Sequence, residues 1–243
     1  MNRVFRKTYT VTDNATDRFD RLRPSMLLFF AQDAATSHCA TLGMDWNTMA
    51  ARDMFWAVTR TKVEIHRLPC HGETVTVETW PMANTRVAYP RATAMYDEKG
   101  ELLVRMVSIW VLMDIEKRSM ILPAKSGLDF CGADRGTELK APAGLPVFPA
   151  ERETMRIVRY SDLDINGHLN NARYLDWVND LTDSEFHRNH SLRQMVICYI
   201  SEAREGQEIT QEWAWSPEEN TLNVQLRREQ DRVFAAKLTY DIM

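Results

Sequence analysis

The chain has 243 residues, of which 44% are apolar and 26% are charged, and its formal net charge is -4. This is the composition of a soluble globular protein that could form one large domain or two ordinary ones. The mild net charge gives no general attraction for nucleic acid. No apolar run approaches the roughly 20 residues that a membrane helix needs. We therefore expect neither nucleic acid nor a membrane as a partner.

The cysteines are scattered along the chain, with no CxxC or Cys/His spacing that would suggest a zinc site. We expect no metal and no cofactor. Free thiols are typical of a reducing compartment, and residues 1–9 lack the apolar core of a signal peptide. These features predict a cytoplasmic protein. The cysteines are Cys39, Cys70, Cys131 and Cys198.

The first half of the chain begins with an alternating segment at residues 5–11, which predicts a strand. A helix is predicted from about Pro24 to His38, because a proline stands in its first turn and nearly every face is apolar. Such a helix is expected to be buried. Alternation such as Val75 and Val77 then predicts several strands. Their ranges are 55–68, 73–82, 87–97 and 102–114.

A segment rich in glycine and proline separates the two halves. Residues 119–150 hold four prolines and four glycines, a composition that interrupts helices and strands. We interpret this segment as a linker between a domain at residues 1–118 and a domain at residues 151–243.

The second half repeats the order of the first, with a strand predicted at residues 155–160 and a helix after it. Tyr174, Trp177, Val178 and Leu181 follow the i, i+3, i+4, i+7 spacing of one helix face, which predicts an amphipathic helix. Strands are again predicted after the helix. Their ranges are 194–203, 207–215, 221–228 and 232–241.

The repeat predicts the architecture. The segment that begins at Leu22 matches the segment that begins at Leu169, an offset of 147 residues. A strand, a helix and a run of antiparallel strands, each occurring twice, indicate the α+β class. We expect two domains, each a curled antiparallel sheet wrapped around a long central helix, packed as a pseudo-dimer.

Asp164, Asn166 and His168 alternate just before the second helix. An extended backbone would place their carboxylate, amide and imidazole on one side, beside a helix N-terminus with free N–H groups. An acid, an amide and a titratable base beside such a helix end suggest a hydrolytic site. The repeat keeps only the aspartate in the first half, as Asp17. We therefore predict one active centre per chain.

The segment Asp164-Ile-Asn166-Gly-His168-Leu-Asn-Asn resembles the acyl-ACP thioesterases of plants and bacteria, which are tandem hotdog-fold enzymes. Tyr199-Ile-Ser-Glu202-Ala resembles the strand of that family that bears a catalytic glutamate. Residues 108–113 resemble a strand of its N-terminal domain. The resemblance implies hydrolysis of fatty acyl-ACP thioesters in fatty acid biosynthesis, without a cofactor. It also implies that Asp164, Asn166, His168 and Glu202 are catalytic.

Two departures from the family pattern affect the expected mechanism. Ala203 stands where plant enzymes commonly have cysteine, which argues against a cysteine nucleophile. Gly167 stands where many relatives have glutamine, which we interpret as a change in backbone freedom. We expect Glu202 and His168 to activate water and Asn166 to hold the water or the carbonyl. Asp164 is expected to orient its neighbours, although a carboxylate nucleophile is also compatible with the sequence.

The remaining substrate contacts are also predicted. Backbone N–H groups at residues 170–172 could form an oxyanion hole. The resemblance implies an acyl pocket in the N-terminal domain, although core packing is the alternative role for its apolar residues. The partner would be acyl carrier protein carrying a fatty acyl chain, and the tandem unit could form a homodimer. The predicted substrate-binding residues are Met26, Phe30, Trp56 and Asn171.

An acidic carrier protein would require a locally basic docking face. The candidates are Arg18, Arg21, Arg23, Arg60, Lys62 and Arg67.

Three other functions are compatible with the same scaffold. One is an acyl-CoA thioesterase, which would share the chemistry and differ in the carrier. Another is a hotdog dehydratase, against which Asn166 and Glu202 argue. The last is a non-catalytic acyl-thioester-binding module. Other hydrolase classes are disfavoured because the sequence contains no GxSxG, HExxH or GxxxxGK[ST] motif.

Overall fold

The computed structural model describes residues 4–128, 132–133 and 135–243. The chain divides into two compact units, Met1–Arg23 with Leu27–Pro142 and Ala143–Met243 with Pro24–Met26. Each unit combines an antiparallel sheet with helices, so the predicted α+β class is confirmed. Among the described residues, no helix combines the length and the apolar character needed to cross a membrane.

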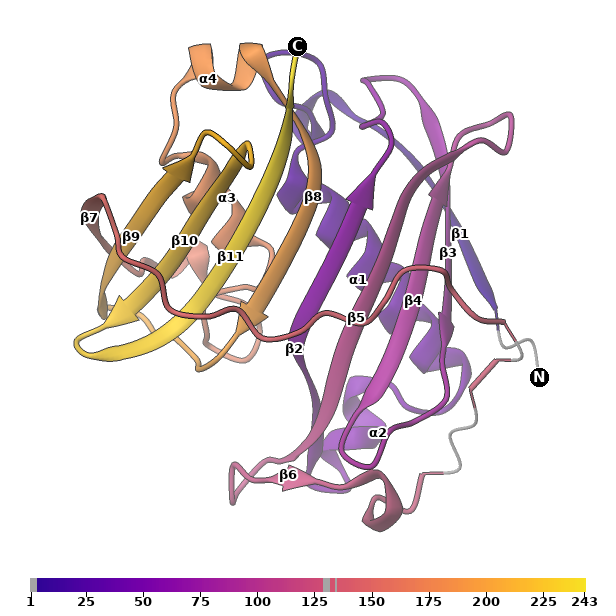
Figure 1. Cartoon of the computed structure of the whole chain (residues 1–243). Coiled ribbons are helices and arrows are strands. Elements are labelled where there is room, and N and C mark those ends of the chain that lie inside the picture. Colours follow the sequence, from indigo (N-terminus) through magenta and orange to yellow (C-terminus); the bar gives the residue numbers. More distant parts are fainter. Residues whose placement is uncertain (1–3, 129–131, 134) are drawn as a thin grey trace. The chain divides into compact units, whose positions relative to one another are not determined.

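The strands of the first unit follow the order β1-β3-β4-β5-β2 (Figure 1). Alternation positions one face of these strands in the core, as predicted, and Val75 and Val77 are fully buried. The strands are β1 (Phe5–Thr10), β2 (Met54–Ile65), β3 (Thr74–Pro81), β4 (Tyr89–Tyr96) and β5 (Leu102–Asp114), with β6 (Met120–Ile121) paired to β5.

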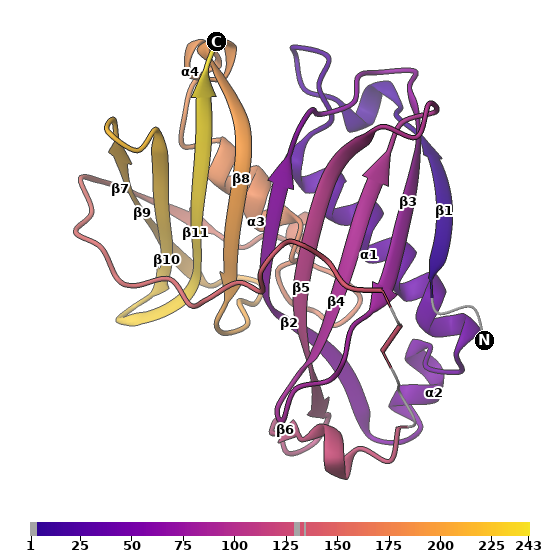
Figure 2. The same cartoon turned by 45° about the vertical axis from the view of Figure 1, so that its right-hand side comes forward.

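Helix α1 (Pro24–Thr41) lies along one face of this sheet (Figure 2), and the short α2 (Trp46–Ala50) follows it. The expectation that α1 is buried on nearly every face is wrong. Leu27 and Ala34 are almost completely buried, whereas Phe29 is 51% exposed. The reason is that the sheet covers only one side of the helix, so a single stripe of residues is buried.

The strands of the second unit follow the order β7-β9-β10-β11-β8. This is the order of the first unit, element for element, as the sequence repeat predicts. Leu222, Val224 and Leu226 alternate into its core with at most 1% exposure. The strands are β7 (Arg152–Ile157), β8 (His190–Tyr199), β9 (Glu208–Ser216), β10 (Thr221–Arg228) and β11 (Asp231–Ile242).

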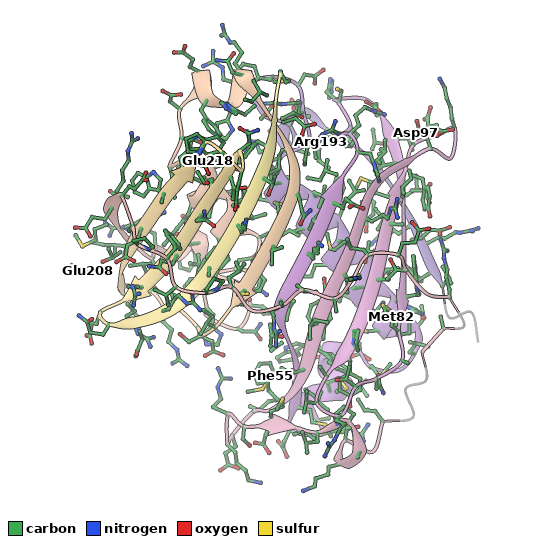
Figure 3. The ribbon with its side chains drawn as sticks, in the orientation of Figure 1. Phe55, Met82, Asp97, Arg193, Glu208 and Glu218 are labelled. Atoms are coloured by element: carbon green, nitrogen blue, oxygen red, sulfur yellow. The ribbon has the colours of Figure 1, made fainter. Side chains whose placement is uncertain are left out.

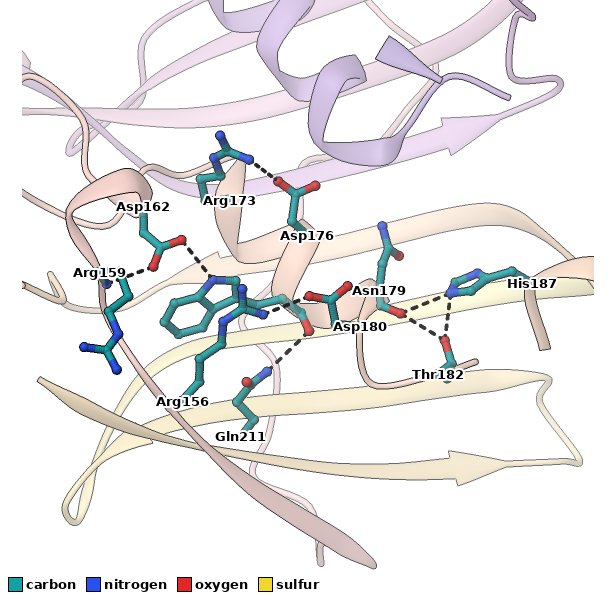
Figure 4. Close-up of polar contacts among 11 residues, drawn as sticks. Arg156, Arg159, Asp162, Arg173, Asp176, Asn179, Asp180, Thr182, His187 and Gln211 are labelled. Atoms are coloured by element: carbon teal, nitrogen blue, oxygen red, sulfur yellow. Dashed lines mark hydrogen bonds and ion pairs between the residues drawn. The ribbon is translucent and has the colours of Figure 1, made fainter. Parts of the chain in front are cut away.

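The second unit does not contain the long central helix that we predicted. Helix α3 (Arg173–Asn179) has seven residues, and α4 (Ser184–Asn189) begins soon after it. The Asn179 carbonyl is bonded by the Thr182 hydroxyl at 3.3 Å and by His187 Nε2 at 3.1 Å (Figure 4). Asp183 then accepts the Phe186 N–H as the cap of α4. These local bonds end α3 after two turns.

The short α3 leaves part of its sheet uncovered. A pocket of about 450 Å³ lies over Trp213, Trp215 and Leu222, with Phe186 of α4 along its wall. The predicted amphipathic face of α3 is nevertheless present, because Tyr174, Trp177 and Val178 are all buried.

Turns and ion pairs hold the exposed ends of the strands. Asp97, in the β4–β5 turn, accepts the N–H groups of Lys99 at 2.9 Å and Glu101 at 2.8 Å (Figure 3). Arg193 of β8 forms an ion pair with Asp241 of β11. The residues that the structure describes also form three single turns of 3-10 helix. They span Asp13–Ala15, Pro123–Lys125 and Tyr160–Asp162.

Candidate active site

The Asp164 carboxylate organises a tight turn ahead of α3. Its Oδ1 accepts the N–H of Asn166 at 2.8 Å and the N–H of His168 at 3.4 Å. The Asp164 N–H donates to the His168 carbonyl at 2.8 Å. Gly167 closes the turn with φ +74°, a left-handed conformation that glycine adopts at little cost. Three of the four predicted catalytic residues therefore share one turn, and Asp164 fixes its backbone.

This turn is joined to the β8–β9 connection, which brings a histidine and a glutamate together. His168 forms an isolated β-bridge with Arg204, and the Leu169 N–H donates to the Ala203 carbonyl at 2.8 Å. His168 Nε2 consequently lies 3.0 Å from Glu202 Oε2. The side chain of His168 is 15% exposed and that of Glu202 is 38% exposed. The pair is thus preformed and open to solvent on one side.

Two arginines that the sequence analysis missed contact Glu202. Arg228 Nη1 donates to the Glu202 carbonyl oxygen at 3.2 Å, and Arg204 Nη2 lies 3.6 Å from Glu202 Oε2. The alternation of Glu202 and Arg204 was an available signal for the second contact. Arg228 is 26 residues away along the chain, and no local pattern marks it.

Glu202 does not lie on a strand, contrary to the prediction for residues 194–203. Strand β8 ends at Tyr199, and Glu202 belongs to the connection that follows. The difference follows from the β11 pairing, in which Tyr199 is opposite Phe234 and the following N–H groups of Ile200 and Ser201 both turn to the Val233 carbonyl. The loop position lets the glutamate reach His168.

A buried tyrosine lies near the glutamate. Burial raises the pKa of Tyr174, with Arg228 opposing the rise and the Glu202 carboxylate adding to it. Its ring stacks on Phe234 with a centroid distance of 4.5 Å. The Tyr174 hydroxyl therefore stays protonated, and this side chain places no full negative charge near Glu202.

Asn166 is exposed, and its amide faces the organising aspartate. Its Nδ2 lies 3.4 Å from Asp164 Oδ2. Within the described residues, no hydrogen bond joins its side chain to the pair of His168 and Glu202. The structure therefore groups the four predicted residues as two contacting pairs linked through the turn backbone.

The N–H groups of residues 170–172 differ in their availability. The Asn170 N–H donates to the Asp162 carbonyl at 2.9 Å, and the Ala172 N–H donates to Asn170 Oδ1 at 2.9 Å. The Asn171 N–H has no acceptor in the part of the chain that the structure describes, while its carbonyl accepts the Tyr199 hydroxyl at 3.1 Å. The Asn170 side chain therefore holds Ala172, the N-cap residue of α3, and Asn171 offers one free backbone donor.

Buried hydrogen bonds of Asp162 also hold the turn, and the sequence analysis missed this residue. It is 8% exposed, accepts the Arg159 N–H at 2.9 Å and lies 3.4 Å from Trp177 Nε1 (Figure 4). Its carbonyl holds Asn170. Asp162 and Asp164 are two residues apart, and the sequence does not indicate which of them is buried and which is an exposed turn residue.

The predicted substrate-binding side chains of the first unit occupy different places. Phe30 stacks on Tyr9 with a centroid distance of 4.5 Å. Trp56 packs edge-on against Tyr89 at 4.8 Å, and Met26 is half-buried. A small void of about 10 Å³ lies elsewhere, between α1 and the sheet. It is lined by Leu27, Ala31, Val77, Thr93, Met95, Val104 and Met106.

Several predicted basic docking residues are neutralised by local acids. Arg21 lies 3.0 Å from Asp17, and Arg67 lies 2.6 Å from Glu73. Arg23 Nε donates to a backbone carbonyl at 2.7 Å. These side chains have less charge available for an acidic partner than the sequence suggested.

The structure describes three of the four cysteines. Cys39, Cys70 and Cys198 are free cysteines, and Cys131 is outside the described residues. No cluster of metal-ligating side chains occurs among the residues that the structure covers.

Solved structures of acyl-ACP thioesterases share this fold. A crystal structure of an acyl-ACP thioesterase from Bacteroides thetaiotaomicron matches with a TM-score of 0.90 at 23% identity, covering 99% of this chain and 98% of that chain. The 12:0-ACP thioesterase from Umbellularia californica matches with a TM-score of 0.82 at 24% identity, covering 99% and 94%. The likeness supports a hotdog-like α+β fold for this chain.

Family models extend the match to the sequence. The acyl-ACP thioesterase N-terminal domain matches residues 2–123 and the C-terminal domain matches residues 150–240. The chain belongs to the acyl-ACP thioesterase family.

One relative is the chloroplastic dodecanoyl-[acyl-carrier-protein] hydrolase of Cinnamomum camphora, 28% identical over 214 residues, which are 82% of this chain and 56% of that protein. This chain spans about half the length of the curated relatives it matches.

Proposed function

We propose that this protein hydrolyses fatty acyl-ACP thioesters to free fatty acid and holo-ACP, in fatty acid biosynthesis. The observation that carries the proposal is the contact of 3.0 Å between His168 Nε2 and Glu202 Oε2 in a chain of this family. A histidine and a carboxylate in contact, with one side open to solvent, can activate water. A positioned general base contributes about 10²- to 10⁴-fold in rate.

The proton movements follow from the contact. With Nε2–H donated to the Glu202 carboxylate, Nδ1 of His168 is left as the acceptor for a proton from water. The water oxygen attacks the thioester carbonyl carbon, and Glu202 stabilises the imidazolium that forms. Collapse of the tetrahedral intermediate breaks the C–S bond, and the imidazolium returns the proton to the leaving thiolate. The products are a fatty acid and the carrier thiol.

The surrounding residues have positioning roles in this proposal. The exposed Asn166 amide holds the attacking water or the thioester carbonyl. The free Asn171 N–H donates to the developing oxyanion, which makes Asn171 the substrate contact through its backbone. Asp164 holds the turn and does not attack, because its Oδ1 already accepts two backbone N–H groups.

The first unit is proposed to hold the acyl chain. Supporting features are its apolar contact between α1 and the sheet, the void at that contact and the family match over residues 2–123. Met26, Phe30 and Trp56 remain proposed contacts. We further propose that the two hotdog units pair as a tandem pseudo-dimer, on the basis of their identical strand order. A cytoplasmic location is proposed from the free cysteines.

The decisive experiment measures fatty acid release from a panel of acyl-ACPs, with matched acyl-CoAs in parallel. Glu202→Gln should reduce kcat by about 10²-fold or more, because the amide cannot stabilise an imidazolium. Glu205→Gln, an exposed neighbour in the same loop, is the matched control and should retain full activity. Normal turnover by a folded Glu202→Gln protein would refute the assigned site. Faster hydrolysis of the acyl-CoAs than of the acyl-ACPs would show that the substrate is carried by coenzyme A and not by acyl carrier protein.

A further inference from the structure

The pocket of the second unit lies on the face of the sheet that α3 covers, beyond the end of that helix. Trp213 and Trp215 of β9 share a face with Gln211, because side chains two residues apart on a strand point the same way. Gln211 Nε2 donates to the Trp177 carbonyl of α3 at 3.3 Å (Figure 4). The pocket volume of about 450 Å³ is within the range of small-molecule sites, roughly 300–1,000 Å³.

The pocket results from the break between α3 and α4. At the repeat offset of 147, residues 184–188 of α4 correspond to residues 37–41, the end of the continuous α1. In the second unit, bonds to the Asn179 carbonyl end α3, and Asp183 caps a new helix. Phe186 of that helix lines the pocket, so specific hydrogen bonds build this wall.

Aromatic rings form much of the wall and contact one another. The Phe186 ring stacks on His190 with a centroid distance of 4.1 Å and lies edge-on to Trp215 at 5.1 Å. His190 Nδ1 donates to the Phe186 carbonyl at 2.8 Å, which uses the single N–H of the neutral imidazole. The faces of aromatic rings, of tryptophan above all, attract cations. The wall therefore favours a cation with an apolar body.

The charged side chains that line the pocket favour the same kind of ligand. They belong to Glu151, Arg152 and Asp183, which are all exposed and sum to one negative charge. Asp183 Oδ1 accepts the Phe186 N–H at 2.8 Å, which leaves Oδ2 for another donor. The Glu151 N–H donates to the Trp213 carbonyl at 3.1 Å and so holds this residue beside the wall. An anionic head would meet two carboxylates and one guanidinium, whereas a cationic head would meet the reverse balance.

We propose that this pocket binds an organic ammonium ion, with the ammonium head at Asp183 and Glu151 and the apolar body against Trp213 and Trp215. The site is distinct from the pair of His168 and Glu202, because neither of these residues lines the pocket. Helix α3 begins beside the candidate turn and ends at the pocket, about 10 Å further on. The inference goes beyond the proposed function and does not depend on thioester hydrolysis.

The first test compares three ligands that share a six-carbon body and differ in charge. Hexylammonium, hexan-1-ol and hexanoate are titrated into the full chain by calorimetry at neutral pH. Hexylammonium should bind about tenfold more tightly than hexan-1-ol, because the rings and the carboxylates both favour its charge. Hexanoate should bind more weakly than either. Equal binding of the ammonium and the alcohol, tighter binding of hexanoate, or binding of none of the three would overturn the proposal.

The second test locates the site with variants checked for folding by circular dichroism. Asp183→Asn keeps the helix cap, because asparagine caps as well as aspartate, and should weaken hexylammonium binding about two- to fivefold. Glu151→Gln should have an effect of similar size. Glu185→Gln is the matched control, since Glu185 is an exposed carboxylate of α4 that does not line the pocket. Equal losses in Asp183→Asn and Glu185→Gln would overturn the proposal, because general surface charge would then account for the binding.

A third measurement separates this site from the candidate active site. Glu202→Gln should bind hexylammonium as the wild type does, because Glu202 does not line the pocket. Loss of binding in a folded Glu202→Gln protein would place the ligand at the candidate active site and overturn the proposal. Trp213→Leu should weaken hexylammonium about two- to fivefold and hexan-1-ol less, since leucine keeps an apolar surface but has no ring face. Equal weakening of the two ligands would count against recognition of the cation by the ring.

Discussion

The turn at Asp17 in the first unit and the turn at Asp164 in the second have the same backbone and different side chains. In each, the aspartate N–H donates at 2.8 Å to the carbonyl four residues on, which belongs to Arg21 or His168. The third residue after the aspartate has positive φ, +62° at Asp20 and +74° at Gly167.

The connections that pair with these turns also correspond. The Leu22 N–H donates to the Pro69 carbonyl at 2.8 Å, as the Leu169 N–H donates to that of Ala203. Arg21 bridges to Cys70 where His168 bridges to Arg204.

The two turns differ in the partner that the side chain of the last turn residue contacts. In the first unit the arginine folds back onto the turn aspartate, with Arg21 Nη2 3.0 Å from Asp17 Oδ2. In the second, the histidine reaches across to Glu202, whose counterpart in the first unit is Leu68. The duplicated backbone is therefore not sufficient for an active site. The site also requires a histidine in the turn and a glutamate in the connection that pairs with it.

The largest effect is expected when the connection that pairs with the second turn is given the corresponding residue of the first unit. Glu202→Leu should lower kcat by about 10²- to 10⁴-fold, because His168 loses the carboxylate that supports its charged form. The leucine should be tolerated structurally, since Glu202 is partly exposed and Leu68 is at the equivalent place. Turnover by acyl-ACP hydrolysis and the thermal midpoint should be measured together. Loss of both in parallel would indicate misfolding instead.

Removing each turn aspartate should separate catalysis from stability. Asp164→Ala and Asp17→Ala both remove acceptors for two backbone N–H groups, so each should lower the free energy of unfolding by about 1 kcal/mol. Only Asp164→Ala should also lower kcat, by about 10- to 100-fold, because His168 is displaced. Equal losses of activity in the two variants, compared by urea unfolding and turnover, would contradict the assignment of one site per chain.

Acid should weaken the first unit through Glu78. Burial raises the pKa of this carboxyl, but ion pairs with Arg135 at 2.6 Å and Arg6 at 2.5 Å outweigh burial and lower the pKa overall. Its stabilising contribution is complete above the unfolded glutamate pKa of about 4.3 and is lost as pH falls through the lower folded pKa. Glu78→Gln should therefore flatten the stability profile below about pH 4.3 in denaturant titrations. An unaltered acid slope would show that these pairs contribute little.

A smaller effect is expected from the backbone of the turns. No atom lies within 4 Å of a Cβ added at Gly167, so Gly167→Ala should cost only the left-handed conformation, about 1 kcal/mol. This corresponds to a fall of about 2 to 4 °C in Tm. Asp20→Gly in the first turn should be nearly neutral, because relief of strain is offset by loss of its bond to the His71 N–H. Calorimetry would reveal a reversed order if Asp20 carried the greater strain.

The smallest effect is expected from the cysteines. Serine at all four positions should change kcat less than about twofold, since the proposed mechanism uses His168 and Glu202 and no thiol. Inactivation of the wild type by a thiol-blocking reagent, with protection in the serine variant, would show that a thiol takes part.

Periodicity in the sequence predicted best the strands in which burial alternates along the chain, such as β1 and the first half of β3. Val75 and Val77 of β3 are completely buried and alternate with the more exposed Thr74 and Thr76, as the pattern indicates. The end of α3 could not be predicted in this way. It depends on bonds from Thr182 and His187 to the Asn179 carbonyl, and side chains that favour a cap give no periodic signal.

The part of the candidate site that is local in sequence could be predicted, and the part that depends on distant contacts could not. Asp164, Asn166 and His168 are close in sequence, so their shared turn followed from local spacing and family resemblance. The contact of His168 with Glu202 depends on a bridge between distant loops, and the sequence alone gives no distance for it. Arg228 and Asp162 were missed because each acts through a long-range or buried contact.

The bridge between His168 and Arg204 has a thermal consequence. The reactive pair is assembled by two loops that pair through one isolated bridge, whereas neighbouring strands such as β10 and β11 pair over many residues. Such loop contacts open at lower free energy than the strands that they join. We therefore expect the amides of Leu169 and Arg204 to exchange with deuterium well before those of β10 and β11. On heating, activity should be lost at temperatures at which the light scattering and the ultraviolet absorption of the protein are still those of the native state.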